Sequence, residues 1–475
     1  MLARLLNRAE NHLALLAALM VAIGTGALIA VDPRAAFTAA FAAAAAASLY
    51  TPAWLPVIAL SLAGLVVLSW GFNNIPFPAG GLTIPLVDVL LIYALLATIP
   101  LWSRLAARVR LVRNLLILLV VLAAISALRL LVDVPRYGAT AGRDALYVLE
   151  AWSVLVGLAA GWVLGASRID RGLSVLWRIA VLFFLLYPIR DALSELGPLV
   201  GIQRPTPLIQ FTNVGYISAV SLFWFLQEAR RSSPFFAALA ILTLLAAQSR
   251  GQLIGVLLTV LVAWLLHSSQ SRSHTGRNMR VLGRAVCITA IAFLVLVLLP
   301  PIQGRIGETV SGSTVVAQLG TLVGQRGPAT GTIEHREEAW RQVIDDVSRT
   351  PGAWLVGIGY GPDLFGGFKV EGGVDVRKPH NDFLEIWART GILGLLPWLG
   401  LLATLLSWAL RVAPRHTYGW WLIALQAATL VAALTQPAFA FAYRGMVYFL
   451  LMGLVIGATL RDHPALYGRS LHGNS

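Results

Sequence analysis

The sequence predicts an all-α integral membrane protein with about 12–14 transmembrane helices, joined by one large loop that contains an amphipathic helix. Of its 475 residues, 58% are hydrophobic and 12% are charged, whereas a soluble domain has roughly 45–50% apolar and about 25% charged residues. Apolar runs close to the length of a bilayer-crossing helix recur from end to end. We therefore expect a single polytopic domain over residues 1–475.

The predicted spans follow these apolar runs. The first run is too long for the core of a signal peptide, so we expect it to be retained as a span. The alanine-rich run at 35–50 is only marginally hydrophobic and would need shielding by neighbouring spans. The spans lie near residues 12–31, 35–50, 52–70, 85–102, 112–133, 146–166, 172–189, 213–227, 234–247, 251–267, 282–300, 381–411, 419–437 and 444–460.

The charge and cysteine content exclude several classes of protein. The formal net charge is +14, but the arginines lie in short loops between apolar runs rather than on one soluble face, so nucleic acid is not an expected partner. The single cysteine, Cys287, lies inside an apolar run, which excludes an intrachain disulfide and a thiolate metal site.

The arginines also predict the topology, because cytoplasmic loops carry the excess of Lys and Arg. With the N-terminus inside, arginine-rich loops alternate with poorer ones, and both termini fall in the cytoplasm. The large loop at 301–380 and the turn at Arg250 then lie outside. The inside arginines are Arg104, Arg108, Arg110, Arg113, Arg168, Arg171, Arg230, Arg231, Arg272, Arg277, Arg280, Arg284, Arg411, Arg415, Arg461 and Arg469.

An amphipathic helix is expected within the large outer loop, between Ile333 and Arg349. The apolar residues Ile333, Trp340, Ile344 and Val347 repeat at helical spacing. Arg336 precedes Trp340 by four residues and falls on the same stripe, where a cation needs a partner or a ligand. Two interpretations stay open: an interfacial anion site, or a side chain that snorkels or pairs with a neighbouring glutamate.

A glycine-rich stretch follows this helix, over Val356-Gly357-Ile358-Gly359-Tyr360-Gly361. It lacks the Lys-Ser/Thr and the strand-to-helix context of a phosphate-binding loop. We interpret it as a tight backbone turn, because glycine permits backbone dihedrals that other residues avoid. A second glycine series, Gly157, Gly161 and Gly165, predicts close helix packing within one span.

His380 stands just before a long apolar helix, in the sequence Lys378-Pro379-His380-Asn381-Asp382. Asp382 and Glu385 have the spacing of a capping box. The positive end of the helix dipole favours a neutral imidazole, which is the form that a general base requires. The alternative is a histidine that only caps or anchors the span.

Two further arginines stand where topology does not require them. Arg250 occupies a short outer turn between two apolar runs, and either binds an anion or anchors the helix end by snorkelling. Arg389 lies about two turns into the span after His380, so it is a buried cation that needs a partner. For Glu150, we expect pairing with an arginine of a neighbouring span.

Four elements in this order resemble the shared C-terminal domain of O-antigen ligases and polymerases. The resemblance covers residues 245–395, about a third of the chain. Each element alone is weak, whereas the ordered set in a membrane context is specific. The elements are Ser249-Arg250-Gly251; Glu334-His335-Arg336 with Trp340; Pro351 with the glycine-rich stretch; and His380-Asn381-Asp382-Phe383-Leu384 with Gly391-Ile392-Leu393-Gly394.

This resemblance implies a glycosyltransferase at the periplasmic face of the bacterial inner membrane. The donor would be a glycan on undecaprenyl diphosphate, and the acceptor a sugar hydroxyl of lipid A core or of a growing polysaccharide. His380 matches the proposed catalytic histidine of the family, and Arg250 and Arg336 match its essential arginines that hold the diphosphate. Arg389 is a further candidate for that cationic pocket. The family implies no metal and no cofactor, and a single displacement would invert the anomeric carbon.

Other functions fit parts of the sequence. A related group of enzymes glycosylates protein, and nothing in these residues identifies the acceptor. A transporter would also have many spans and buried charges, but it usually shows internal repeats and midplane sites, and we find no convincing repeat. A structural membrane subunit would leave Arg250, Arg336 and His380 unexplained.

Overall fold

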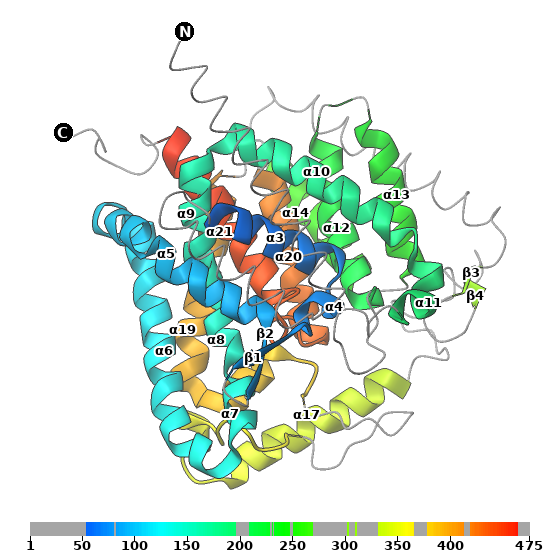
Figure 1. Ribbon diagram of the computed structural model, residues 1–475. Helices are drawn as coiled ribbons and strands as arrows, with labels where there is room; N and C mark the ends of the chain where they lie inside the picture. The colour runs from blue at the N-terminus through cyan, green and yellow to red at the C-terminus, as the bar shows by residue number, and fades with distance from the viewer. Residues whose placement is uncertain are drawn as a thin grey trace.

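The computed structural model describes residues 54–79, 82–195, 209–228, 230, 232–247, 250–268, 302–303, 309–310, 331–364, 378–412 and 419–463. Nearly all of their secondary structure is helical, which confirms the predicted all-α class (Figure 1). The predicted spans at 12–31, 35–50 and 282–300 lie outside the described residues.

Every other predicted span overlaps a helix. The helices are α3 (Trp54–Val67), α4 (Trp70–Asn73), α5 (Leu86–Arg108), α6 (Arg110–Tyr137), α7 (Ala139–Asp144), α8 (Leu146–Ala151), α9 (Ser153–Leu164), α10 (Ala166–Phe184), η1 (Tyr187–Ile189), α11 (Arg190–Ser194), α12 (Phe211–Gln227), α13 (Ser233–Ala246), α14 (Arg250–Ser268), α17 (Gly331–Arg349), α18 (Ala353–Val356), α19 (Asp382–Val412), α20 (Gly419–Thr435) and α21 (Gly445–Asp462).

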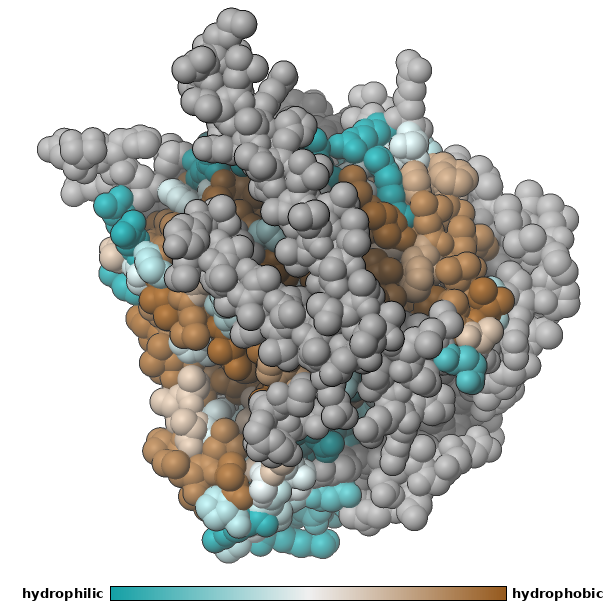
Figure 2. Space-filling model, in the orientation of Figure 1, coloured by the Kyte–Doolittle hydropathy of each residue, from teal (hydrophilic) through white to brown (hydrophobic). Residues whose placement is uncertain are grey.

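Five helical segments in the described part are long and apolar enough to cross a membrane: 86–108, 110–137, 139–164, 382–412 and 445–462. Large apolar side chains on α5 and α6 are exposed, which is expected where lipid replaces water as the solvent. Figure 2 shows them as a brown band at the left of the view, with hydrophilic side chains above and below it. The most exposed are Leu96, Leu128 and Leu131. This distribution is that of a multi-pass membrane protein.

Glycines bring α9 and α21 into backbone contact. A Cβ atom at Gly157 or Gly161 would overlap the carbonyl oxygens of Leu450 and Leu454, which confirms the predicted close packing. Gly165 does not continue this contact, because it follows the end of α9 in a left-handed conformation with φ of 72°. The prediction for Gly165 was therefore wrong.

Two short hairpins interrupt the helices, and the sequence analysis did not anticipate them. Strand β1 (Pro76–Ala79) pairs antiparallel with β2 (Leu82–Pro85), directly before α5. Strands β3 (Ile302–Gln303) and β4 (Thr309–Val310) form the second pair. Strands this short carry too few residues for a visible period-two pattern.

The predicted amphipathic helix of the large loop is α17, which lies at the bottom edge of the view in Figure 1, opposite the C-terminal end of α21. Its buried face is Ala339, Val343 and Val347, packed against Ala388 of α19. Ile344 is 45% exposed, so its predicted place on the buried stripe was wrong. The residues of the observed buried face are spaced four apart. The prediction did not include Ala339, a small residue, in this face.

Candidate active site at the start of α19

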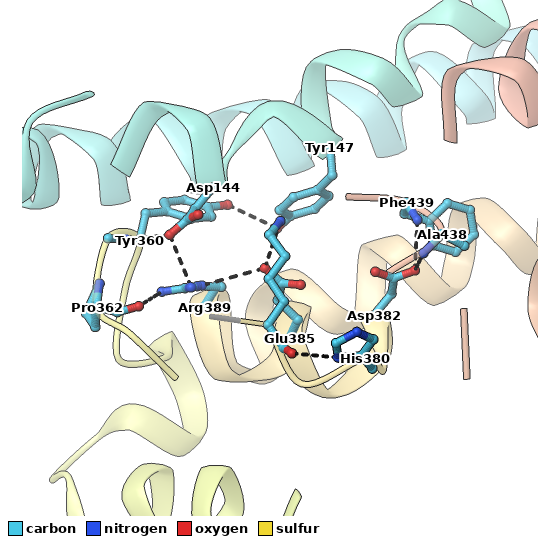
Figure 3. A network of polar contacts seen from close by, with 12 residues as sticks. Asp144, Tyr147, Tyr360, Pro362, His380, Asp382, Glu385, Arg389, Ala438 and Phe439 are labelled. Carbon is cyan, nitrogen blue, oxygen red and sulfur yellow. Dashed lines mark hydrogen bonds and ion pairs between the residues drawn. The ribbon is translucent and has the colours of Figure 1, made fainter. Parts of the chain in front are cut away.

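Residues on both sides of the α19 N-terminus fix its position. The side chain of Asn381 accepts a hydrogen bond from the Leu384 amide at 3.2 Å, so Asn381 is the N-cap. The predicted capping box of Asp382 and Glu385 was wrong. Asp382 is buried and instead accepts hydrogen bonds from the backbone amides of Ala438 and Phe439, at 2.7 and 2.8 Å (Figure 3). This carboxylate ties the start of α19 to the segment between α20 and α21.

Removing the Asp382 carboxylate should destabilise this junction. In Asp382→Ala, two buried amides lose their acceptor, and an unsatisfied buried donor costs about 1–3 kcal/mol. We expect a clearly lower apparent Tm in detergent for Asp382→Ala, and nearly the wild-type Tm for Asp382→Asn, whose amide oxygen still accepts. Asp345→Ala, on the exposed side of α17, is the matched control. Equal melting temperatures for Asp382→Ala and this control would contradict the assignment.

His380 has an unusual backbone conformation, with φ of 50°. A non-glycine residue in this region costs about 1–3 kcal/mol, and such residues cluster at functional sites. Its Nδ1 lies 3.1 Å from the carbonyl oxygen of Lys378. A carbonyl only accepts, so Nδ1 carries the proton in this contact, and the neutral ring then has its lone pair on Nε2. The local backbone thus selects the tautomer in which Nε2 is basic.

Helix α17 is joined directly to the His380 segment. The indole nitrogen of Trp340 donates a hydrogen bond of 2.6 Å to the carbonyl oxygen of Pro379. Arg336, one turn earlier, lies on the same side of α17 as Trp340 and is half-buried. The structure therefore places Arg336 on the helix side that faces the histidine segment.

The glycine-rich stretch is a tight turn, as predicted. Gly357, Gly359 and Gly361 have positive φ angles, and the Ile358 amide donates to the carbonyl of Ala388 in α19. A Cβ atom on Gly357 would overlap the backbone of Arg389. Gly391 has φ of 64° and breaks the regular geometry of α19 at the same contact. The turn and the kink fit together because neither has a side chain.

Arg389 is the electrostatic centre of this region and is fully buried. Its Nη1 donates to the carbonyl oxygens of Gly359 and Pro362, at 3.1 and 2.7 Å. Its Nη2 lies 3.1 Å from Asp144, and its Nε 4.0 Å from Glu385 (Figure 3). These two ion pairs fall short of hydrogen-bond geometry. The guanidinium thus joins α19 to the glycine turn and to α7.

Two neighbouring groups complete this network. Lys378 Nζ lies 3.3 Å from Glu385, so the carboxylate is shared between two cations. Tyr360 is buried and its phenol bonds to Ser126 and Tyr147, at 2.8 and 3.0 Å. Burial raises the pKa of Tyr360 to about 12, so the phenol stays neutral near pH 7. These residues hold the first turns of α19 rigidly.

Arg250 is the first residue of α14, and its side chain lies outside what the structure describes. The next residue, Gly251, has the Thr435 hydroxyl oxygen 3.0 Å from the position of an added Cβ. Thr435 ends α20, directly before the segment that Asp382 binds. The backbone of Arg250 is therefore at the same end of the helix bundle as His380 and α17. We call this end of the bundle the His380 end.

Sequence reasoning missed Arg444, which is 1% exposed at the start of α21. Its guanidinium carbon lies 5.2 Å from the Tyr443 ring centroid, and its Nε and Nη1 have no hydrogen-bond partner within the described part of the chain. It forms no ion pair with any described residue. The reasoning applied to Arg250, a cation at the outer end of a span, would have found it.

Other charged residues within the described helices include two paired arginines and one unpaired glutamate. Arg129 pairs with Asp133 at 3.0 Å, and Arg178 pairs with Glu228 at 2.9 Å. Glu150 is 3% exposed and forms no ion pair within the described residues, so the expected arginine partner was wrong.

The model of the O-antigen ligase family matches the chain over residues 235–399. Residues 235–399 thus match the O-antigen ligase domain, which we call the ligase domain. Its bounds agree closely with the region of resemblance found from the motifs, and the match supports an enzyme of the ligase and polymerase type in a multi-pass membrane protein. No curated protein matches the chain.

The ligase domain contains every predicted site residue: Arg250, Arg336, His380 and Arg389. Several groups that hold the site lie outside it. Asp144 of α7, which pairs with Arg389, precedes the domain, and the amides that bind Asp382 follow it. The ligase domain is therefore completed by α7 on its N-terminal side and by the segment between α20 and α21 on its C-terminal side.

Proposed function

We propose that this protein is a membrane glycosyltransferase that moves a glycan from undecaprenyl diphosphate to a sugar hydroxyl at the periplasmic face of the bacterial inner membrane. The observation that carries the proposal is the 3.1 Å contact of His380 Nδ1 with the Lys378 carbonyl oxygen, which leaves Nε2 as the basic nitrogen at the N-terminus of α19, within the ligase domain. The mechanism is inverting and uses no metal. The acceptor is lipid A core or a polysaccharide repeat unit.

His380 acts as the general base. Nε2 takes the proton of the acceptor hydroxyl as the oxygen attacks the anomeric carbon; the bond from that carbon to the diphosphate oxygen breaks, and the diphosphate leaves with the electron pair. The bond from Nδ1 to Lys378 stabilises the imidazolium that forms. General-base assistance of this kind is typically worth about two to four powers of ten in rate.

Arg250 and Arg336 hold the diphosphate as negative charge develops on it. A guanidinium binds phosphate oxygens through two parallel hydrogen bonds, and stabilising a leaving group's charge is often the largest catalytic contribution. The buried Arg444 adds a third cation at this end. A buried guanidinium without an anion is costly, and the donor diphosphate would offset that cost.

For Arg389, the contacts support a positioning role rather than direct contact with the diphosphate. Its guanidinium is enclosed by Asp144, Glu385 and two carbonyl oxygens. By holding the glycine turn against α19, it sets the place of His380 relative to α17.

The proposal is tested with purified protein and a lipid-linked glycan donor. The three acceptor classes are lipid A core, a second lipid-linked repeat unit and protein. We expect transfer to one of the two glycan acceptors. Transfer to protein alone would replace the acceptor assignment with that of a protein O-oligosaccharyltransferase, and release of no donor glycan to any acceptor would overturn the proposal.

Lysine substitutions test the two arginines. Arg250→Lys and Arg336→Lys keep the charge but lose the paired hydrogen bonds, and each charge-assisted bond contributes about 1.5–3 kcal/mol. We expect transfer to fall about tenfold to a hundredfold in each variant. Arg341→Lys, on the exposed side of the same helix α17, should be unaffected. Full activity in Arg250→Lys would show that Arg250 anchors the helix end in the membrane and does not bind the diphosphate.

A further inference from the structure

A cavity lined by both polar and apolar side chains lies between α6 and α19, at the end of the bundle away from His380. Its volume is about 620 Å³, and it is lined by residues from the first turns of α6 and the last turns of α19. Beyond its kink at Gly391, helix α19 runs to Val412, about 30 Å at 1.5 Å per residue. The cavity is therefore about a membrane thickness from the histidine, and it is a separate site.

Two arginines line this cavity, one from each helix: Arg110 and Arg411. Both are exposed, and neither forms an ion pair with a described residue. No acidic side chain is among the lining residues. Asn114 and Ser407 add polar groups beside them, whereas the hydroxyl of Thr404 is used by the carbonyl of Gly400.

Topology alone explains why arginines are here, but not why they share a cavity. The positive-inside rule needs cations near the ends of spans, and Arg104 and Arg108 satisfy it without lining this cavity. Arg110 and Arg411 come from positions about 300 residues apart in the chain and meet across one space. Apolar lining residues, including Leu111 and Trp408, adjoin the polar ones.

We propose that this cavity binds the phosphate head group of an anionic membrane phospholipid. Two guanidinium groups match the oxygens of one phosphate diester. Basic pockets between transmembrane helices at the cytoplasmic side are known to take such head groups. The apolar lining and the exposed apolar side of α6 continue the site toward the acyl chains. This proposal is independent of the proposed glycan transfer, because the cavity shares no residue with the candidate active site.

The test uses the full-length protein in a neutral detergent and native mass spectrometry. The ligands are phosphatidylglycerol, phosphatidylcholine with the same acyl chains, and inorganic phosphate. We expect phosphatidylglycerol to bind at least about tenfold more tightly than phosphatidylcholine. Inorganic phosphate in equal amount should not displace it, because it lacks the acyl chains. Displacement by inorganic phosphate would overturn the lipid assignment.

Three variants locate the site. The double variant Arg110→Gln/Arg411→Gln should lose the preference for phosphatidylglycerol, and the matched double variant Arg104→Gln/Arg108→Gln should keep it. Ser407→Trp adds a large side chain to the cavity lining while both arginines remain, and it should also lose the preference. The proposal would be overturned if the two double variants had the same preference for phosphatidylglycerol, or if Ser407→Trp kept the wild-type preference.

Discussion

Replacing His380 with asparagine should slow glycan transfer severely and leave donor binding intact. Asparagine tolerates the left-handed backbone conformation found at this position, so the substitution removes the imidazole with little change in the backbone. Loss of the general base should lower the transfer rate about a hundredfold to ten-thousandfold. The measurement is the rate of product formation by purified protein, together with the affinity for the lipid-linked donor.

The chain offers a matched histidine control. His463 is exposed at the end of α21, far along the chain from the ligase domain, and His463→Asn should transfer at the wild-type rate. Wild-type transfer by His380→Asn would remove His380 from the mechanism. Loss of donor binding in the same variant would instead identify His380 as a ligand of the substrate.

Replacing Arg389 with methionine should destabilise the protein more than any other single change discussed. The substitution would leave Asp144 and Glu385 buried with less or no compensating charge, and breaking a buried ion pair in this way costs about 3–5 kcal/mol. It would also remove the donor for two carbonyl oxygens. We expect a much lower apparent Tm and a polydisperse, partly aggregated protein in detergent.

Two comparisons separate this structural role from substrate binding. Arg349→Met removes an exposed arginine whose pair with Asp345 contributes little, and it should melt like the wild type. The double variant Arg389→Met/Asp144→Asn should recover part of the lost stability, because the unpaired buried charge is gone. If Arg389→Met kept the wild-type Tm and lost only transfer, Arg389 would be a substrate ligand, as the sequence first suggested.

The helices were predictable from the sequence because they depend on local patterns. A run of apolar residues identifies a span wherever the rest of the chain lies, so every predicted span in the described part is helical. Gly157 and Gly161 were recognisable as a packing surface because small residues four apart leave a groove on one side of a helix. The amphipathic helix α17 followed from the same periodicity.

The partners of the polar side chains were not predictable in the same way. The spacing of Asp382 and Glu385 is that of a capping box, but Asp382 binds amides 56 and 57 residues later in the chain. Arg389 was recognised as a buried cation, yet its partner Asp144 lies in a different helix, and no local rule connects the two. Sequence spacing identifies helical neighbours, whereas these contacts depend on how distant helices meet.

The most direct test of the central claim is an electron cryo-microscopy structure of the protein with a glycan-linked undecaprenyl diphosphate donor bound. We predict that the diphosphate lies at the His380 end, within hydrogen-bonding distance of the guanidinium groups of Arg250 and Arg336, with Nε2 of His380 facing the anomeric position. A diphosphate bound elsewhere, or guanidinium groups that point away from the histidine, would contradict the account.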